Sequence, residues 1–116
     1  MDKNILVITD NEGSNIIRTL VKHKVFPIIR RTIPSAIQVL RHLKVSAIIV
    51  EDEHKSVDTL ELILNVRDLD NLTPIYISNR YQEHKVIKKI KQMGQIIIFD
   101  ETDSIFNKIL KNLITN

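Results

Sequence analysis

The 116-residue sequence contains no cysteine and only two glycines. Without cysteine the chain cannot form a disulfide, a thiolate nucleophile or a cysteine-ligated zinc or iron–sulfur site. With Gly13 and Gly94 alone, it cannot build a dinucleotide-binding fingerprint or a P-loop, because each needs several glycines at fixed spacing. These absences exclude several classes of enzyme and electron carrier.

The sequence also has few aromatic residues and no long hydrophobic run. Its apolar runs are far shorter than the ~20 residues that span a membrane, and its first residues lack the pattern of a secretory signal. We therefore expect a cytoplasmic protein with no membrane partner. Since a hydrophobic content of 43% in 116 residues suffices for one core, we predict a single domain over residues 1–116. Three phenylalanines are expected in that core, namely Phe26, Phe99 and Phe106.

Five short runs rich in isoleucine and valine predict β-strands. Most of them do not alternate polar with apolar residues, which is typical of strands covered on both faces. Pro27 lies in the second run and predicts a weak or edge strand there, because proline has no N–H to donate. The predicted strands cover residues 4–8, 24–29, 46–50, 74–78 and 95–99.

Between these runs, apolar residues recur at spacings of three and four, which predicts five amphipathic helices. Ser14 is suited to cap the first helix, Pro34 to the first turn of the second, and Gly94 to a helix end. The predicted helices cover residues 16–21, 33–43, 57–64, 86–93 and 105–113.

Strict alternation of strand and helix, (βα)5, predicts an α/β fold with a doubly wound parallel sheet of five strands and helices on both faces. The common solution is the flavodoxin-like strand order 2-1-3-4-5, with a ligand crevice at the carboxyl ends of strands 1 and 3. More than half of the 14 acidic residues would lie at this edge. They are Asp10, Glu12, Glu51, Asp52, Glu53, Asp100, Glu101 and Asp103.

With this order of elements, the sequence resembles the receiver domain of response regulators over nearly its whole length. NILVITDNE is similar to the family's first strand, which ends in an acidic pair. VSAIIVEDE is similar to the strand that ends in the phosphorylated aspartate. TPIYISNR is similar to the fourth strand with its terminal hydroxyl residue, and QMGQIIIFDET to the fifth strand. The resemblance implies a regulatory domain of two-component signal transduction.

At the positions where receiver domains carry their catalytic residues, this sequence departs from the family. One of the two acids that bind Mg²⁺ is missing, because the pair reads Thr9 and Asp10. The phosphoacceptor position falls on Glu51, or on Asp52 if the third strand is one residue longer. The hydroxyl switch position falls on Ser78, or on Asn79 by the same kind of shift.

Two further positions also lack the residues that receiver domains use for phosphorylation and switching. The lysine that would pair with the acyl phosphate is replaced by Asp100 or Glu101, which reverses the charge, and the aromatic switch position falls on Ile98. Phosphoryl transfer requires a positioned carboxylate, a metal and neutralising cations. The resemblance therefore implies a pseudo-receiver that is not an enzyme and that keeps the fold without the usual aspartyl phosphorylation.

Two alternatives stay open for the acidic edge. Asp10 and Glu51 are candidate ligands for Mg²⁺, the only cofactor that the sequence suggests, because hard cations bind carboxylate oxygens. The alternative function is a phosphoacceptor response regulator with an unusual metal-assisted site at Glu51 or Asp52. The acids could equally serve only as helix caps and loop residues.

Positive charge gathers on the predicted fourth helix, where the stretch RYQEHKVIKKIK carries five basic residues and one acid. Lys85, Lys88 and Lys89 lie away from its apolar side and are candidate partner-binding residues. In receiver domains the fourth helix, fifth strand and fifth helix bind partners. The resemblance thus implies that another protein, or a second copy of this chain, binds there.

A second basic group spans the first two predicted helices and the second strand. It lacks interleaved aromatic residues, and the sequence contains no motif of a nucleic-acid-binding fold, so we do not expect nucleic acid as a partner. The group consists of Lys22, Lys24, Arg30, Arg31, Arg41 and Lys44.

Overall fold

A computed structural model of the chain describes residues 4–11, 13–51, 59–69, 72–78, 94–99, 107–108 and 111–113. All strands in it belong to one five-stranded parallel sheet of order β2-β1-β3-β4-β5. The α/β class and this strand order confirm the prediction from the sequence. The strands are β1 (Ile5–Thr9), β2 (Ile28–Arg30), β3 (Ala47–Glu51), β4 (Ile75–Ser78) and β5 (Ile96–Phe99).

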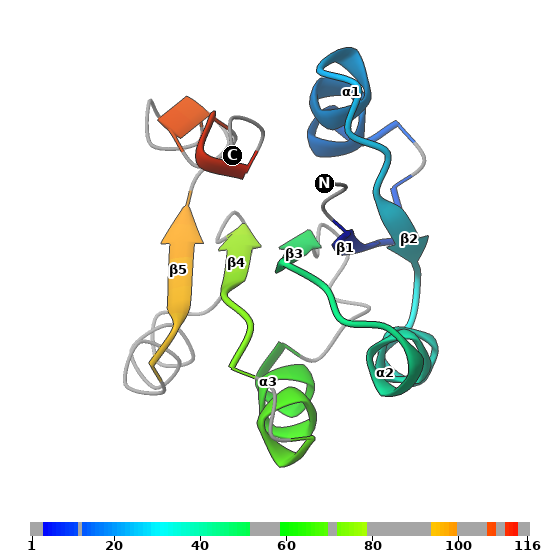
Figure 1. The fold of residues 1–116 in the computed structure, drawn as a ribbon, viewed down its shortest axis with the longest axis vertical. Helices are drawn as coiled ribbons and strands as arrows, with labels where there is room; N and C mark the ends of the chain where they lie inside the picture. Colours follow the sequence, from blue (N-terminus) through cyan, green and yellow to red (C-terminus); the bar gives the residue numbers. More distant parts are fainter. Residues whose placement is uncertain are drawn as a thin grey trace.

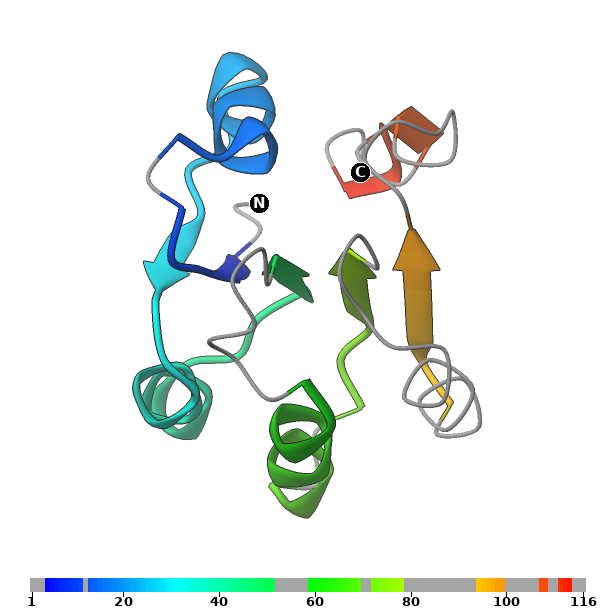
Figure 2. The same ribbon diagram turned by 180° about the vertical axis from the view of Figure 1, so that it is seen from behind.

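Helices cover both faces of the sheet. They are α1 (Asn15–Lys22), α2 (Ile33–His42) and α3 (Thr59–Asp68), and residues 107–108 and 111–113 are also helical. Figure 1 shows α1 and the C-terminal helical residues on one side of the strands and α2 and α3 on the other. Figure 2 shows the same two layers from behind. The predicted fourth helix, at 86–93, lies outside the described residues. No helix in the described part of the chain has both the length and the apolarity needed to cross a membrane.

The central strands are buried on both faces because successive side chains of a strand point to opposite sides. One set packs against α2 and α3 and the other against α1, so two apolar clusters sandwich the sheet. The strand residues of the first cluster include Leu6, Ile8, Ile48, Val50, Ile75 and Ile77. Those of the second are Ile5, Val7, Ala47, Ile49 and Phe99.

The helix starts follow the expected capping chemistry. The side chain of Ser14 accepts a hydrogen bond from the N–H of Ile17 at 3.3 Å, as its position before α1 predicts. Pro34 lies in the first turn of α2, where the missing proline N–H has no helical partner to lose. Gly94 has a φ of +71°, the positive φ on which its predicted role at a helix end depends, although the predicted helix before it lies outside the described residues.

Strand β2 lies at the edge of the sheet and is only three residues long. It starts after Pro27, in agreement with the predicted weak edge strand. The prediction for Phe26 was wrong, since its side chain is 71% exposed. This residue lies before β2 begins, on the side of the sheet that has no further strand to cover it. Phe99 is buried as predicted, and Phe106 lies outside the described residues.

Candidate functional site

Within the described residues, four polar side chains are buried, and all four lie at the carboxyl edge of the sheet. Thr9, Glu51 and Ser78 are the last residues of β1, β3 and β4, and Ser14 caps α1, which begins just beyond β1. Burying polar groups costs free energy unless they are hydrogen-bonded. Their concentration at one edge marks this edge as the candidate functional site.

Three of these side chains form a row across neighbouring strands. Thr9 is the register partner of Glu51, and the pairing of Val50 with Ile77 makes Ser78 the next neighbour of Glu51 on β4. Residues in register on parallel strands point to the same face. Thr9, Glu51 and Ser78, called the polar row below, therefore continue the face that packs against α1.

A hydrogen bond joins the first two members of the polar row. The hydroxyl of Thr9 donates to Oε1 of Glu51 at 2.8 Å and accepts from the N–H of Asn11 at 3.0 Å. Glu51 is 1% exposed, so the carboxyl group lies inside the edge of the sheet rather than in the open crevice. Its Oε2 is also buried, and no described residue donates a hydrogen bond to it.

The carboxyl edge also contains a small hollow beside the polar row. Asp10 bends away from β1, is half-buried, and lines this hollow of about 200 Å³ together with Asn11, Ile17 and Arg31. Arg31 follows β2, which neighbours β1, so a guanidinium and a carboxylate line one hollow. The sequence analysis placed Arg31 only in a basic group. The strand order 2-1-3 contained the missing signal, because it brings the residue after strand 2 next to the residue after strand 1.

The role of Thr9 within the site was also missed. The sequence analysis treated this residue as a lost metal ligand and did not foresee its bond to Glu51. The available signal was the position of Thr9, a polar residue two places after Val7 on a strand expected to be buried on both faces. A hydroxyl at such a position needs a partner, and the end of the neighbouring third strand is the place to seek it.

Ile98 lies in β5, is half-buried, and packs in the cluster under α2 and α3, on the opposite face from the polar row. Asp10, Glu51 and Ser78 do meet at the carboxyl edge. The other predicted site residues lie outside the described residues. These are Asp52, Asn79, Lys85, Lys88, Lys89, Asp100 and Glu101.

In the ranges that the structure describes, no three aspartate, glutamate or histidine side chains are grouped closely enough to hold a metal ion. Asp10 and Glu51 supply two carboxylates to this edge, whereas hard cations such as Mg²⁺ prefer several oxygen ligands. Mg²⁺ binding at Asp10 and Glu51 remains a prediction for experiment.

Tyr76 lies on β4 two positions before Ser78, and partial burial raises the pKa of its phenol. The folded protein therefore keeps the Tyr76 proton at a pH where the unfolded chain, with an ordinary tyrosine pKa of 10.0, has lost it. We expect stability to fall as the pH rises through this value, because the unfolded state then binds fewer protons than the folded state. The free energy of unfolding of Tyr76→Phe should therefore decrease less between neutral and alkaline pH than that of the wild type.

Urea denaturation of both proteins at neutral pH and above pH 10 measures this difference. At neutral pH both side chains are uncharged, so that comparison isolates the effect of removing the hydroxyl group. An identical alkaline loss in wild type and Tyr76→Phe would show that Tyr76 is not the group responsible.

No protein-family model matches the sequence, and no curated protein matches it significantly. The resemblance to receiver domains therefore depends on the order and spacing of the strands and of the residues that follow them. The confirmed strand order supports the fold part of that resemblance.

Proposed function

We propose that this chain is a pseudo-receiver domain that acts by protein–protein interaction in a cytoplasmic signalling or regulatory pathway, without the usual aspartyl phosphorylation. The observation that carries the proposal is the buried hydrogen bond from Thr9 to Glu51. By the resemblance, position 9 is one of the two metal-binding acids of a receiver, and position 51, or position 52 by a shift of one residue, is its phosphoacceptor.

Two carboxylates at positions 9 and 51 would repel one another unless a cation lay between them. In this chain a hydroxyl at position 9 donates directly to the carboxyl group at position 51. Position 9 therefore carries no carboxylate, and Oε1 of Glu51 has a hydrogen-bond donor without a metal. This arrangement supports a site that has exchanged metal binding for an internal hydrogen bond.

Accessibility supports the same proposal. A phosphoacceptor must approach a phosphorus atom in line with the leaving group, so at least one of its oxygens must reach the donor. Glu51 is 1% exposed and its Oε1 already accepts from Thr9. A phosphodonor at the hollow beside Asp10 would meet a carboxyl group that is turned into the sheet.

A partner surface at the fourth helix, fifth strand and fifth helix is part of the proposal, with Lys85, Lys88 and Lys89 as its predicted contacts. Ile97 of β5 is exposed, as is Lys108 in the C-terminal helical residues. An exposed apolar side chain on β5 and an exposed basic one in the C-terminal helical residues support binding of a protein or of a second copy of the chain at this surface.

Amide NMR spectra recorded during titration with Mg²⁺ and then beryllofluoride, which mimics an acyl phosphate, test the loss of phosphorylation chemistry. We expect no saturable shifts at Thr9, Asp10, Glu51 or Ser78. The matched control is Thr9→Asp/Glu51→Asp, which restores an acid at position 9 and the family's acceptor at position 51. This variant should respond to Mg²⁺, since it again presents several carboxylates at one edge.

Saturable shifts in the wild type at Glu51 and Ser78 would contradict the proposal. Mass spectrometry after incubation with acetyl phosphate separates the alternative function further. A phosphoryl adduct that Glu51→Gln or Asp52→Asn abolishes would identify a metal-assisted phosphoacceptor at that residue.

A further inference from the structure

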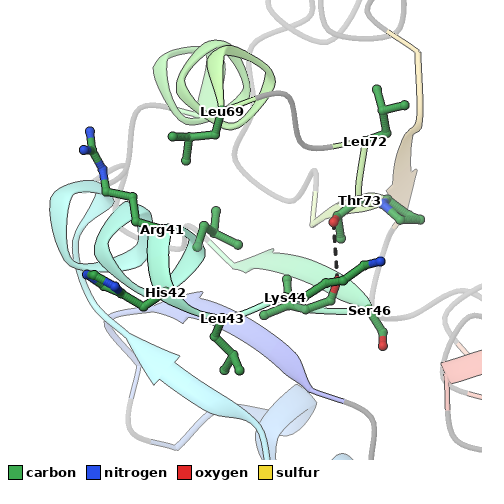
Figure 3. A pocket seen from close by; sticks show the side chains of 11 residues that line it. Arg41, His42, Leu43, Lys44, Ser46, Leu69, Leu72 and Thr73 are labelled. Atoms are coloured by element: carbon green, nitrogen blue, oxygen red, sulfur yellow. Dashed lines mark hydrogen bonds between the residues drawn. The ribbon is translucent and has the colours of Figure 1, made fainter.

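A larger hollow, of about 730 Å³, lies at the opposite, amino edge of the sheet. One wall is the connection from α2 to β3, and the other is formed by residues 69 and 72–74 between α3 and β4; Figure 3 shows the two facing one another. We call it the amino-edge groove. Leucine and valine side chains line much of it, among them Leu40, Leu43, Val45, Leu69 and Leu72.

Two of these apolar side chains are open to solvent. Leu72 is 73% exposed and Leu43 is 39% exposed, whereas Leu40 and Val45 are buried. The groove thus has a buried aliphatic floor and exposed leucines at its rim. Exposed apolar side chains grouped around a concave surface are typical of an interaction site.

Among the described residues that line the groove, the charged side chains, Arg41 and Lys44, are both positive. Arg41, His42 and Lys44 lie along its α2 side, and none of the described residues that line it is acidic. A cation in the last turn of α2, such as Arg41, also stabilises the helix dipole. Lys44 lies beyond the end of the helix, so the dipole does not account for it.

The same sign extends over the neighbouring elements. Residues 13–50 contain seven lysines and arginines and no aspartate or glutamate, although the whole chain carries a net charge of only +3. This segment includes α1, β2, α2 and most of β3. The α2–β3 wall of the groove therefore belongs to a positively charged segment, which would attract an acidic partner.

The groove walls are held in place by hydrogen bonds. The N–H of Ser46 donates to Asn4 O at 2.7 Å, and the hydroxyl of Thr73 donates to Val45 O at 3.4 Å. On the other wall the guanidinium of Arg67 donates to Thr73 O at 3.2 Å. A preformed groove loses little conformational entropy when a ligand binds.

A second hollow adjoins the first and continues it toward the sheet edge. It measures about 450 Å³, shares His42 and Leu43 with the groove, and is also lined by Ile28, Val39 and Arg30. The two hollows repeat the same combination of aliphatic and basic side chains. None of the residues that the structure describes along the two hollows is aromatic.

We propose that the amino-edge groove binds an acidic segment of a partner protein that carries leucine-like side chains. The two hollows fit successive aliphatic side chains, and the basic rim complements carboxylates between them. The described lining of the groove offers no aromatic platform on which nucleic-acid bases could stack. The proposal rests on the interaction role proposed above and gives that role a partner class and a surface separate from the polar row.

Fluorescence anisotropy with a labelled short peptide of glutamate and leucine tests the proposal directly. The comparison probes are the same peptide with serine in place of leucine and a single-stranded oligonucleotide of similar charge. We expect the glutamate–leucine peptide to bind more tightly than either comparison probe. The Arg41→Glu/Lys44→Glu variant should bind this peptide about tenfold more weakly than the wild type does.

The matched control is Lys22→Glu/Lys24→Glu, which makes the same change in net charge at two exposed lysines that do not line the groove. It should weaken binding about twofold at most, through the long-range field alone. Amide shifts during the same titration should centre on Leu43, Lys44 and Thr73.

Three results would each overturn the groove proposal. They are an equal loss of peptide affinity in the two charge-reversal variants, tighter binding of the oligonucleotide than of the peptide, and no peptide binding. None of these outcomes depends on how the polar row responds to Mg²⁺ or beryllofluoride. Failure of the groove proposal can therefore be told apart from failure of the pseudo-receiver proposal.

Discussion

Thr9→Val is expected to lower the free energy of unfolding by about 2 kcal/mol, although valine and threonine have nearly the same shape. The substitution removes the hydroxyl that donates to Glu51 Oε1 and accepts from the N–H of Asn11. Because Glu51 is buried, water cannot readily replace the lost donor. Urea denaturation followed by circular dichroism measures the change.

A double-mutant cycle identifies the partner in this loss. Glu51→Met removes the carboxyl group and keeps a side chain of similar length. In Thr9→Val/Glu51→Met both the hydroxyl group of β1 and the carboxyl group of β3 are gone, so neither is left buried without its partner. We expect the free energy of unfolding of the double variant to lie about 1 kcal/mol or less below that of the wild type. The losses of the two single variants would then not be additive.

Thr19→Val is the matched control. The hydroxyl of Thr19 donates to Asn15 O at 2.7 Å, but this bond is exposed on α1, so the substitution should cost no more than about 0.5 kcal/mol. If Thr9→Val behaved like Thr19→Val, the carboxyl group of Glu51 would not depend on Thr9. The main support for the pseudo-receiver proposal would then be lost.

Ile48→Ala should have the largest effect on the fold, a loss of about 4 kcal/mol. Ile48 is fully buried in β3, the middle strand, in register with Leu6 on one side and Ile75 on the other. Alanine would leave a cavity that three strands and the helices beneath them cannot close. Small domains are stable by only about 5–15 kcal/mol, so this variant should unfold at a much lower urea concentration.

Ile97→Ala provides the comparison for Ile48→Ala. Ile97 lies on the edge strand β5 and is 41% exposed, so the same substitution should cost about 1 kcal/mol. Equal losses at the two positions would show that β5 is covered in solution. A second copy of the chain on this side would be one cause, which sedimentation analysis would detect.

The buried carboxyl group of Glu51 is the clearest departure from a purely apolar core. Burying it costs free energy, and the single hydrogen bond to Oε1 offsets only part of that cost. Departures of this kind concentrate at functional sites.

Much of the fold could be predicted from local sequence features. The strands begin and end within about one residue of the predicted runs, apart from β2, where Pro27 delays the start. Ser14 and Pro34 mark the starts of α1 and α2 because capping depends on only a few neighbouring residues. Phe26 was wrongly predicted to lie in the core. Its exposure depends on the absence of a further strand beyond β2, which the residues around Phe26 do not reveal.

The candidate site was less predictable, because it depends on register between distant segments. The sequence left open whether Glu51 or Asp52 points into the crevice, since a shift of one residue moves a strand side chain to the opposite face. The structure ends β3 at Glu51 and pairs it with Thr9, 42 positions earlier in the chain. The amino-edge groove likewise joins two connections that are far apart in sequence.

The sequence by itself determined the α/β class, the five strands and their order, because burial on both faces requires apolar runs and parallel strands require crossover helices. It also determined which acids follow each strand. Only the tertiary structure decided that the carboxyl group of Glu51 turns inward to Thr9 and that basic and leucine side chains meet at the amino edge. Local pattern sets the elements, whereas register and packing between distant segments set which side chains face one another.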